Sequence, residues 1–148
     1  MNIPIKSGAL IPILIMLPNI LWILLPQSAK SDKGPVPLAL NIAENIGRAA
    51  ILIIPFFYSL SFDKRVSIPA LAIVCLALAF YYAAWARYFA GGRIAALMGA
   101  SLAGLPLPLA VSPAILLTAS AYLLGSWPML AAAVWFGIAH IWVSALTL

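Results

Sequence analysis

The residues best suited to chemistry lie in the stretch LNIAENIGRAAILIIP, which runs from Leu40 to Pro55. Its polar side chains occupy positions i, i+3, i+4 and i+7 of a predicted helix and so share one face: Asn41, Glu44, Asn45 and Arg48. Glu44 is the only glutamate of the chain, and Arg48 follows it at the spacing at which opposite charges meet. A guanidinium oriented in this way by a carboxylate is suited to hold an anion.

The composition indicates where this polar face must lie. Of 148 residues, 66% are hydrophobic and 7% are charged, which no water-soluble domain of this size tolerates on its surface. The chain is therefore expected in a lipid bilayer. The basic residues stand singly or in pairs between apolar runs, a pattern typical of loop ends near lipid headgroups, so no nucleic-acid partner is expected. The single cysteine, Cys75, lies in an apolar run, and neither a metal nor a cofactor is expected.

The apolar runs predict an all-α fold, a polytopic integral membrane protein with a single compact bundle over residues 1–148. Five transmembrane helices are expected at about 8–27, 38–61, 66–89, 109–125 and 128–148. Pro106 and Pro108, behind Gly104, should break a helix begun at Arg93, so the segment 93–105 is expected as a helical piece of roughly 12 residues, interfacial or re-entrant. Six spans are the alternative.

The distribution of basic residues suggests an orientation. With five spans, one side carries Lys30, Lys33, Arg87 and Arg93, and the other carries Lys6, Lys64 and Arg65. This split favours the first side as cytoplasmic, with the N-terminus outside, in a membrane of the bacterial cytoplasmic type.

The polar residues of different helices are expected at similar depths in the bilayer. At about 1.5 Å per residue, Glu44 lies roughly 9 Å and Arg48 roughly 15 Å below the side that carries Arg87. The last span enters from the opposite side and reaches His140 about 12 Å short of the Glu44 side. Since polar groups in a membrane normally face the bundle interior, we expect one polar pocket, lined by Asn19, Asn41, Glu44, Asn45, Arg48, Arg87, Arg93 and His140.

Each of these residues also has a structural interpretation. Glu44 and Arg48 could form a neutralised pair that only locks helices together, and His140 could be a hydrogen-bonded core residue. Asn19 follows Pro18 and could satisfy a carbonyl that this proline leaves free. The arginines at the end of the third span could reach headgroups. The nearby aromatic residues are typical of an interfacial belt: Tyr81, Tyr82, Trp85 and Tyr88.

Short segments of the chain resemble two known families. LNIAEN resembles the N-x-x-E-N segment in the second helix of the MAPEG family, trimeric membrane proteins that handle glutathione, and the resemblance implies that Asn41 and Glu44 contact glutathione. That family has an arginine shortly before the asparagine, where this chain has PLAL. AENIGR with FGIAH resembles the EExxxR and FxxxH motifs of intramembrane CAAX-type proteases, but Ala43 replaces the glutamate that is catalytic in that family.

Three functions follow as expectations. The first is a pocket that binds or moves a polar or lipid-headgroup ligand, with Arg48 holding the anion. The second is a membrane-embedded transferase or hydrolase in which His140 is the general base. The third is an accessory subunit without chemistry, or a homo-oligomer, whose Glu44 and Arg48 lie on the outer surface toward a partner protein.

Overall fold

The computed structural model describes residues 7–25, 34–62 and 67–148, and these residues are all-helical apart from turns and one isolated bridge. The 3-10 turn Ser7–Ala9 leads into α1 (Leu10–Leu24). Next come α2 (Leu38–Ile53), the 3-10 turn Ile54–Phe57 and α3 (Ser67–Ala90). A single helical turn, α4 (Ala96–Gly99), precedes α5 (Pro108–Leu124) and α6 (Trp127–Thr147).

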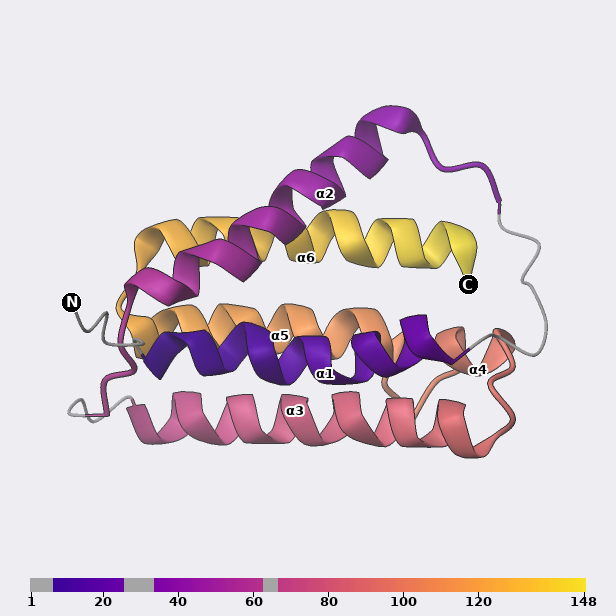
Figure 1. Cartoon of the computed structure of the whole chain (residues 1–148), viewed down its shortest axis with the longest axis horizontal. Coiled ribbons are helices and arrows are strands. Elements are labelled where there is room, and N and C mark those ends of the chain that lie inside the picture. Colours follow the sequence, from indigo (N-terminus) through magenta and orange to yellow (C-terminus); the bar gives the residue numbers. More distant parts are fainter. Residues whose placement is uncertain (1–6, 26–33, 63–66) are drawn as a thin grey trace.

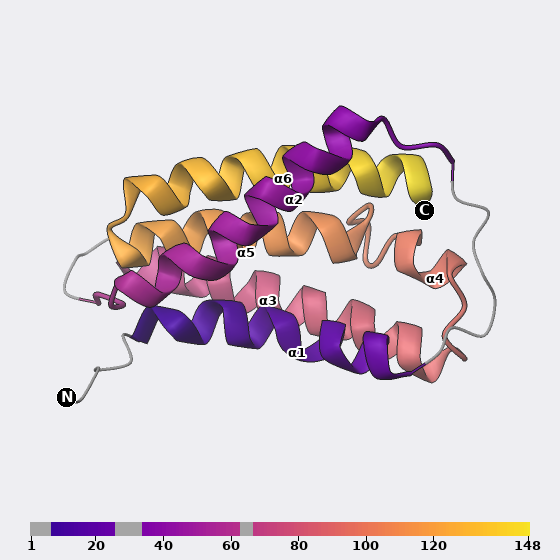
Figure 2. The same cartoon turned by 45° about the horizontal axis from the view of Figure 1, so that its top comes forward.

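The five long helices form a bundle in which consecutive helices run in alternating directions (Figure 1). Helix α5 lies in the centre and packs against both α3 and α6, while α2 crosses the outer side of α6 obliquely (Figure 2). Helix α1 begins at one end of the bundle and α6 ends at the other, where α4 also lies. The end of α3 and the start of α2 therefore share the end that holds α4.

Four helical segments of the described chain are long and apolar enough to cross a membrane: Ser7–Leu24, Leu38–Phe57, Ser67–Ala90 and Trp127–Thr147. Helix α5 is apolar but has 17 residues, or about 26 Å at the usual helical rise. It is also the most enclosed of the long helices, so other parts of the chain surround most of it. Ser126 caps the start of α6 by accepting a hydrogen bond from the backbone N–H of Met129 at 3.2 Å, and Gly125 ends α5 in the left-handed conformation.

The second helix is shorter than predicted. The apolar run predicts a helix to residue 61, whereas α2 ends at Ile53 and the chain is extended at Tyr58. Pro55 accounts for the difference, because it has no N–H to continue the helical ladder and its ring clashes with the preceding turn.

The segment 93–105 is also not the 12-residue helix that we predicted. Only Ala96–Gly99 are helical, and Arg93, Ala103 and Leu107 have positive φ values. Side-chain contacts replace helical hydrogen bonds here: the Arg87 guanidinium, at the end of α3, donates to the carbonyl oxygens of Leu97, Ala100 and Ser101. Arg87 thereby binds this irregular segment to the end of α3.

The aromatic residues of α3 do not form an interfacial belt, contrary to the expectation. Tyr81, Trp85 and Tyr88 are 2%, 4% and 0% exposed and pack edge to face in the core of the bundle. Of the four residues expected in the belt, Tyr82 alone is partly exposed. The three buried rings lie on the face of α3 that is directed into the bundle, where they belong to its hydrophobic core.

Candidate functional site

A cavity of about 360 Å³ lies among the long helices at the half of the bundle nearer α4. Helix α1 contributes Asn19 and Trp22, and α6 contributes His140 and a turn of polar residues beyond it. Helix α2 contributes Glu44 and Arg48. Most of the wall is apolar, so the cavity joins a small set of polar groups to a large hydrocarbon surface.

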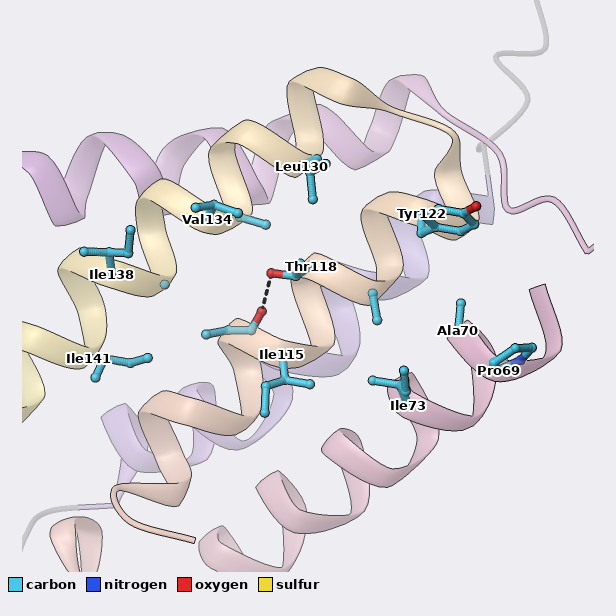
Figure 3. Close-up of a pocket in the computed structure, with 14 residues that line it drawn as sticks. Pro69, Ala70, Ile73, Ile115, Thr118, Tyr122, Leu130, Val134, Ile138 and Ile141 are labelled. Carbon is cyan, nitrogen blue, oxygen red and sulfur yellow. Dashed lines mark hydrogen bonds between the residues drawn. The ribbon is translucent and has the colours of Figure 1, made fainter. Parts of the chain in front are cut away.

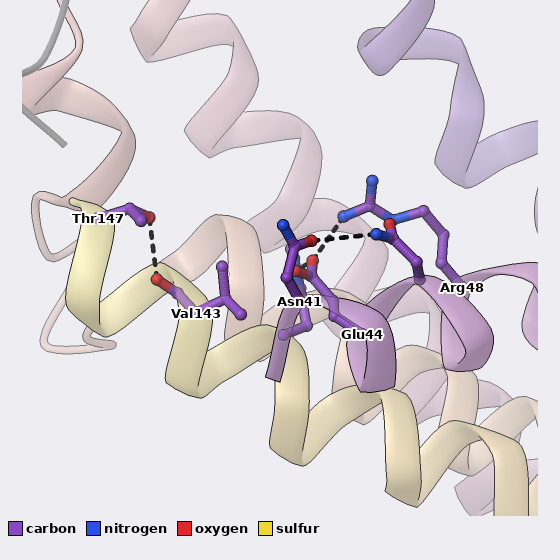
Figure 4. Close-up of polar contacts among 7 residues, drawn as sticks. Asn41, Glu44, Arg48, Val143 and Thr147 are labelled. Atoms are coloured by element: carbon purple, nitrogen blue, oxygen red, sulfur yellow. Dashed lines mark hydrogen bonds and ion pairs between the residues drawn. The ribbon is translucent and has the colours of Figure 1, made fainter. Parts of the chain in front are cut away.

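Three of its side chains form a hydrogen-bonded triad centred on Glu44. Oε1 of Glu44 accepts from Nη2 of Arg48, one turn later on α2, and lies 2.8 Å from Nδ1 of His140 on α6 (Figure 4 shows the Arg48 bond). An ionised carboxylate can only accept hydrogen bonds, so Nδ1 of His140 carries the hydrogen. The juxtaposition of Glu44 with His140 agrees with the depths counted from the sequence.

Exposure differs sharply within the triad. The side chain of Glu44 is 5% exposed, that of His140 22% and that of Arg48 49%. The carboxylate is thus enclosed by protein, whereas the guanidinium lies at the mouth of the cavity. Gly47 permits this arrangement, since a Cβ there would lie only 3.0 Å from Cα of Phe136 and would separate α2 from α6.

Several polar atoms of the cavity remain available to a ligand. Within the described residues, Oε2 of Glu44, Nε2 of His140, and Nε and Nη1 of Arg48 have no hydrogen-bond partner. Nε1 of Trp22 is buried and also lacks one. Donors and acceptors therefore face the same cavity from α1, α2 and α6.

Asn19 lines the cavity but does not satisfy the carbonyl that Pro18 frees. Proline removes the hydrogen bond to the carbonyl four residues earlier, which belongs to Leu14. The Tyr82 hydroxyl donates to that oxygen at 2.7 Å. Asn19 instead donates through Nδ2 to the oxygen of Ile15 at 2.8 Å and to the Tyr81 hydroxyl at 2.7 Å. These bonds join α1 to α3.

Four of the expected site residues lie outside the cavity lining. Asn41 and Asn45 are exposed on α2, and Nδ2 of Asn45 donates to Oδ1 of Asn41 at 3.0 Å. Asn41 is labelled beside Glu44 in Figure 4. Arg87 is engaged by the carbonyls of the α4 segment. Arg93 occupies the turn after α3, and its backbone N–H donates to the carbonyl of Tyr88.

Two polar residues that follow His140 on α6 were not predicted as site residues. Ser144 and Thr147 line the cavity, and the Thr147 hydroxyl donates to the carbonyl of Val143 at 2.9 Å (Figure 4). Their signal was present, because Ser144 and Thr147 follow His140 at the i+4 and i+7 positions of one helical face. Trp22 was missed because one indole in an apolar run has no distinctive spacing.

A second hollow lies on the outside of the bundle between α3, α5 and α6 and measures about 640 Å³ (Figure 3). It is almost entirely apolar, with Ile73, Ile115 and Ile138 among its walls. The hydroxyl of Thr118 donates to the carbonyl of Ala114 within its own helix at 2.8 Å, so its hydrogen is not available to a ligand. The polar cavity and this groove share no lining residue.

The positions of Glu44, Arg48 and Asn41 bear on the accessory-subunit and glutathione-site expectations. An accessory role expects both Glu44 and Arg48 on the outer surface; the side chain of Arg48 is 49% exposed, whereas that of Glu44 is only 5% exposed. A glutathione site built on Asn41 and Glu44 expects both in one pocket, yet Asn41 is exposed outside it. Comparison of the chain with protein-family models, with curated proteins and with solved structures finds no match.

Proposed function

We propose that this chain is a multi-pass protein of a bacterial-type cytoplasmic membrane whose cavity binds an amphipathic ligand with an oxyanion headgroup. The observation that carries the proposal is the Arg48 guanidinium, half exposed at the mouth of a mostly apolar cavity and held from behind by the buried carboxylate of Glu44. The ligand is bound for transfer, presentation or sensing within the bilayer.

The charge of the ligand follows from which member of the ion pair is accessible. A ligand entering the cavity meets Arg48 before Glu44, because their side chains are 49% and 5% exposed. Arginine has five N–H donors in a planar fork that matches carboxylate and phosphate oxygens. Glu44 uses only Nη2 of the guanidinium, so Nη1 and Nε remain to donate to an anion.

The apolar part of the ligand follows from the rest of the wall. Trp22 and Ile23 of α1, Leu52 of α2 and Phe136 of α6 surround the polar groups with hydrocarbon and aromatic surface. Burial of an alkyl chain there contributes about 25 cal/mol per Å² of apolar surface. A headgroup alone would leave this surface uncovered.

Membrane placement is supported by the surface as well as by helix length. Large apolar side chains are exposed all along the helices, for example Phe57, Ile68 and Ile138 at 64% or more. A soluble protein rarely shows so extensive an apolar surface. Five spans place the two ends of the described chain on opposite sides, with the N-terminal side outside as the basic residues favour.

Binding of defined lipids tests the proposal. The purified full chain is titrated with phosphatidylglycerol, with phosphatidylcholine of the same acyl chains and with dimethyl phosphate, and tryptophan fluorescence reports binding. We expect binding of phosphatidylglycerol, with much weaker binding of the zwitterionic lipid and of the headgroup without a tail. Tight binding of dimethyl phosphate would instead identify a free oxyanion as the ligand.

A matched pair of variants links the binding to Arg48. Arg48→Gln should weaken phosphatidylglycerol binding by about 10- to 100-fold, the value of a charge-assisted hydrogen bond of about 1.5–3 kcal/mol. Arg93→Gln removes the same charge outside the cavity and should bind normally. Equal binding by the Arg48 variant, or equal affinity for both lipids, would refute the proposal.

A membrane-embedded hydrolase or transferase is the second candidate. The specific observation in its favour is the bond between Nδ1 of His140 and Glu44, which orients an imidazole with Nε2 free in the cavity, as a general base requires. Incubation with phosphatidylglycerol should then release a fatty acid or a headgroup, and His140→Ala should stop the release. Absence of any product from the unaltered chain would exclude phosphatidylglycerol hydrolysis.

A further inference from the structure

We infer that a proton binds together with the anionic ligand, at Nε2 of His140. The inference rests on the proposed function and adds a second, chemically defined ligand to the same cavity. It is carried by three features of the triad: the shared oxygen of Glu44, the unpartnered Nε2 and the charge balance of the site.

The hydrogen-bond pattern determines which nitrogen takes up the proton. Glu44 is paired with Arg48 and accepts from His140 through the same Oε1, so Nδ1 of the imidazole already carries its hydrogen. The remaining lone pair is on Nε2, which has no partner among the described residues and belongs to a side chain that lines the cavity. A proton added there converts an acceptor into a donor directed at the ligand.

The charge balance supplies the driving force. Without ligand, Arg48 and Glu44 neutralise each other, so the triad carries no net charge when the imidazole binds no second proton. A monoanion would then leave one uncompensated negative charge in a largely apolar cavity, which is costly at low dielectric. One proton taken from water by His140 cancels that charge, and the imidazolium can donate to an oxygen of the ligand: neutral imidazole, proton and anion become an imidazolium–anion pair. No other bond changes.

The titratable groups near His140 are few. Glu44 and Arg48 face it from α2, and Tyr81 of α3 lines the same cavity with its hydroxyl engaged by Asn19 and Ile15. The described parts of α1, α4 and α5 contribute no titratable side chain to the lining.

The pH dependence of phosphatidylglycerol binding tests the inference, because its phosphodiester stays a monoanion near neutral pH. Full coupling predicts an affinity that falls up to tenfold per pH unit where the free imidazole is neutral, with about one proton taken up per lipid. Proton uptake is measured in weakly buffered detergent solution as the lipid is added.

His140→Gln keeps a hydrogen-bonding side chain but cannot be protonated, and it should bind with little pH dependence and no proton uptake. Cys75→Ala, at an exposed position outside the cavity, should retain the wild-type slope. Binding that depends on Arg48 but not on pH would overturn the inference and leave the proposed function intact. A slope that persists in His140→Gln would assign the proton to another group and would also overturn it, whereas no binding at any pH would refute both.

Discussion

Replacing Glu44 by glutamine tests whether the triad is an organised site or an incidental contact. Glutamine has nearly the same shape and can still accept from His140, but it carries no charge for Arg48. Oε1 of Glu44 accepts two hydrogen bonds from cationic or polar donors and is enclosed by protein. The variant therefore loses the charged component of both bonds and little packing.

The size of the effect can be worked out from these contacts. A hydrogen bond to a charged group contributes about 1.5–3 kcal/mol, roughly twice a neutral one, so two such bonds lose about 2–3 kcal/mol when the charge is removed. Part of this loss is offset because the variant no longer desolvates a buried carboxylate. The unpaired Arg48 guanidinium also remains partly solvated, since half of its side chain is exposed at the cavity mouth. We expect a net loss near 2 kcal/mol, or a Tm lower by about 4–8 °C.

Thermal unfolding in detergent, followed by circular dichroism, measures this shift, and the lipid titration measures the functional effect. Asn41→Ala is the matched control, since it removes an exposed amide one turn earlier on the same helix and should change stability by less than about 0.5 kcal/mol. Glu44→Leu should abolish lipid binding because nothing then orients Arg48. A Glu44→Gln protein with unchanged or higher Tm and unchanged lipid affinity would show that the pair has no organising role.

Three further outcomes follow from other contacts. Tyr82→Phe should cost about 1 kcal/mol by leaving the Leu14 carbonyl unpaired, and adding Pro18→Ala should restore most of that loss in thermal unfolding, since alanine supplies the missing N–H; no rescue would contradict this assignment. Arg87→Gln should release the α4 segment from α3 and make it a faster site of limited proteolysis, while the helices stay protected. In a Cys75→Ala background, cysteines at the exposed Ser59 and Ser101 should react with impermeant maleimide from opposite sides of the membrane, and labelling from one side would refute the five-span topology.

The choice of position for topology labelling depends on the exposure of each serine in the structure. Ser67 lies in a polar connector and looks suitable for topology labelling, but its side chain is 3% exposed at the start of α3. Ser59 serves better because it lies in the exposed extended chain after α2. Ser31, the other such position, lies outside the described residues.

The helical class and the presence of a buried polar face could be predicted from sequence, because long apolar runs admit few other structures and helical periodicity places Glu44 and Arg48 on one face. Counting residues along each helix was enough to bring His140 to the depth of Glu44. These properties depend only on distance along a helix axis. The ends of the helices could be predicted less well from the sequence, as the early end of α2 before Pro55 and the short α4 segment show.

The rotation of each helix about its own axis was decided only by the tertiary structure. In a lipid bilayer the surroundings of the bundle are as apolar as its interior, so hydrophobicity cannot distinguish an inward face from an outward one. The packing of α2 against α6, with Gly47 beside Phe136, directs Glu44 inward and leaves Asn41 and Asn45 outside. The packing of α3 likewise turns its aromatic residues into the core and leaves Cys75 on the surface.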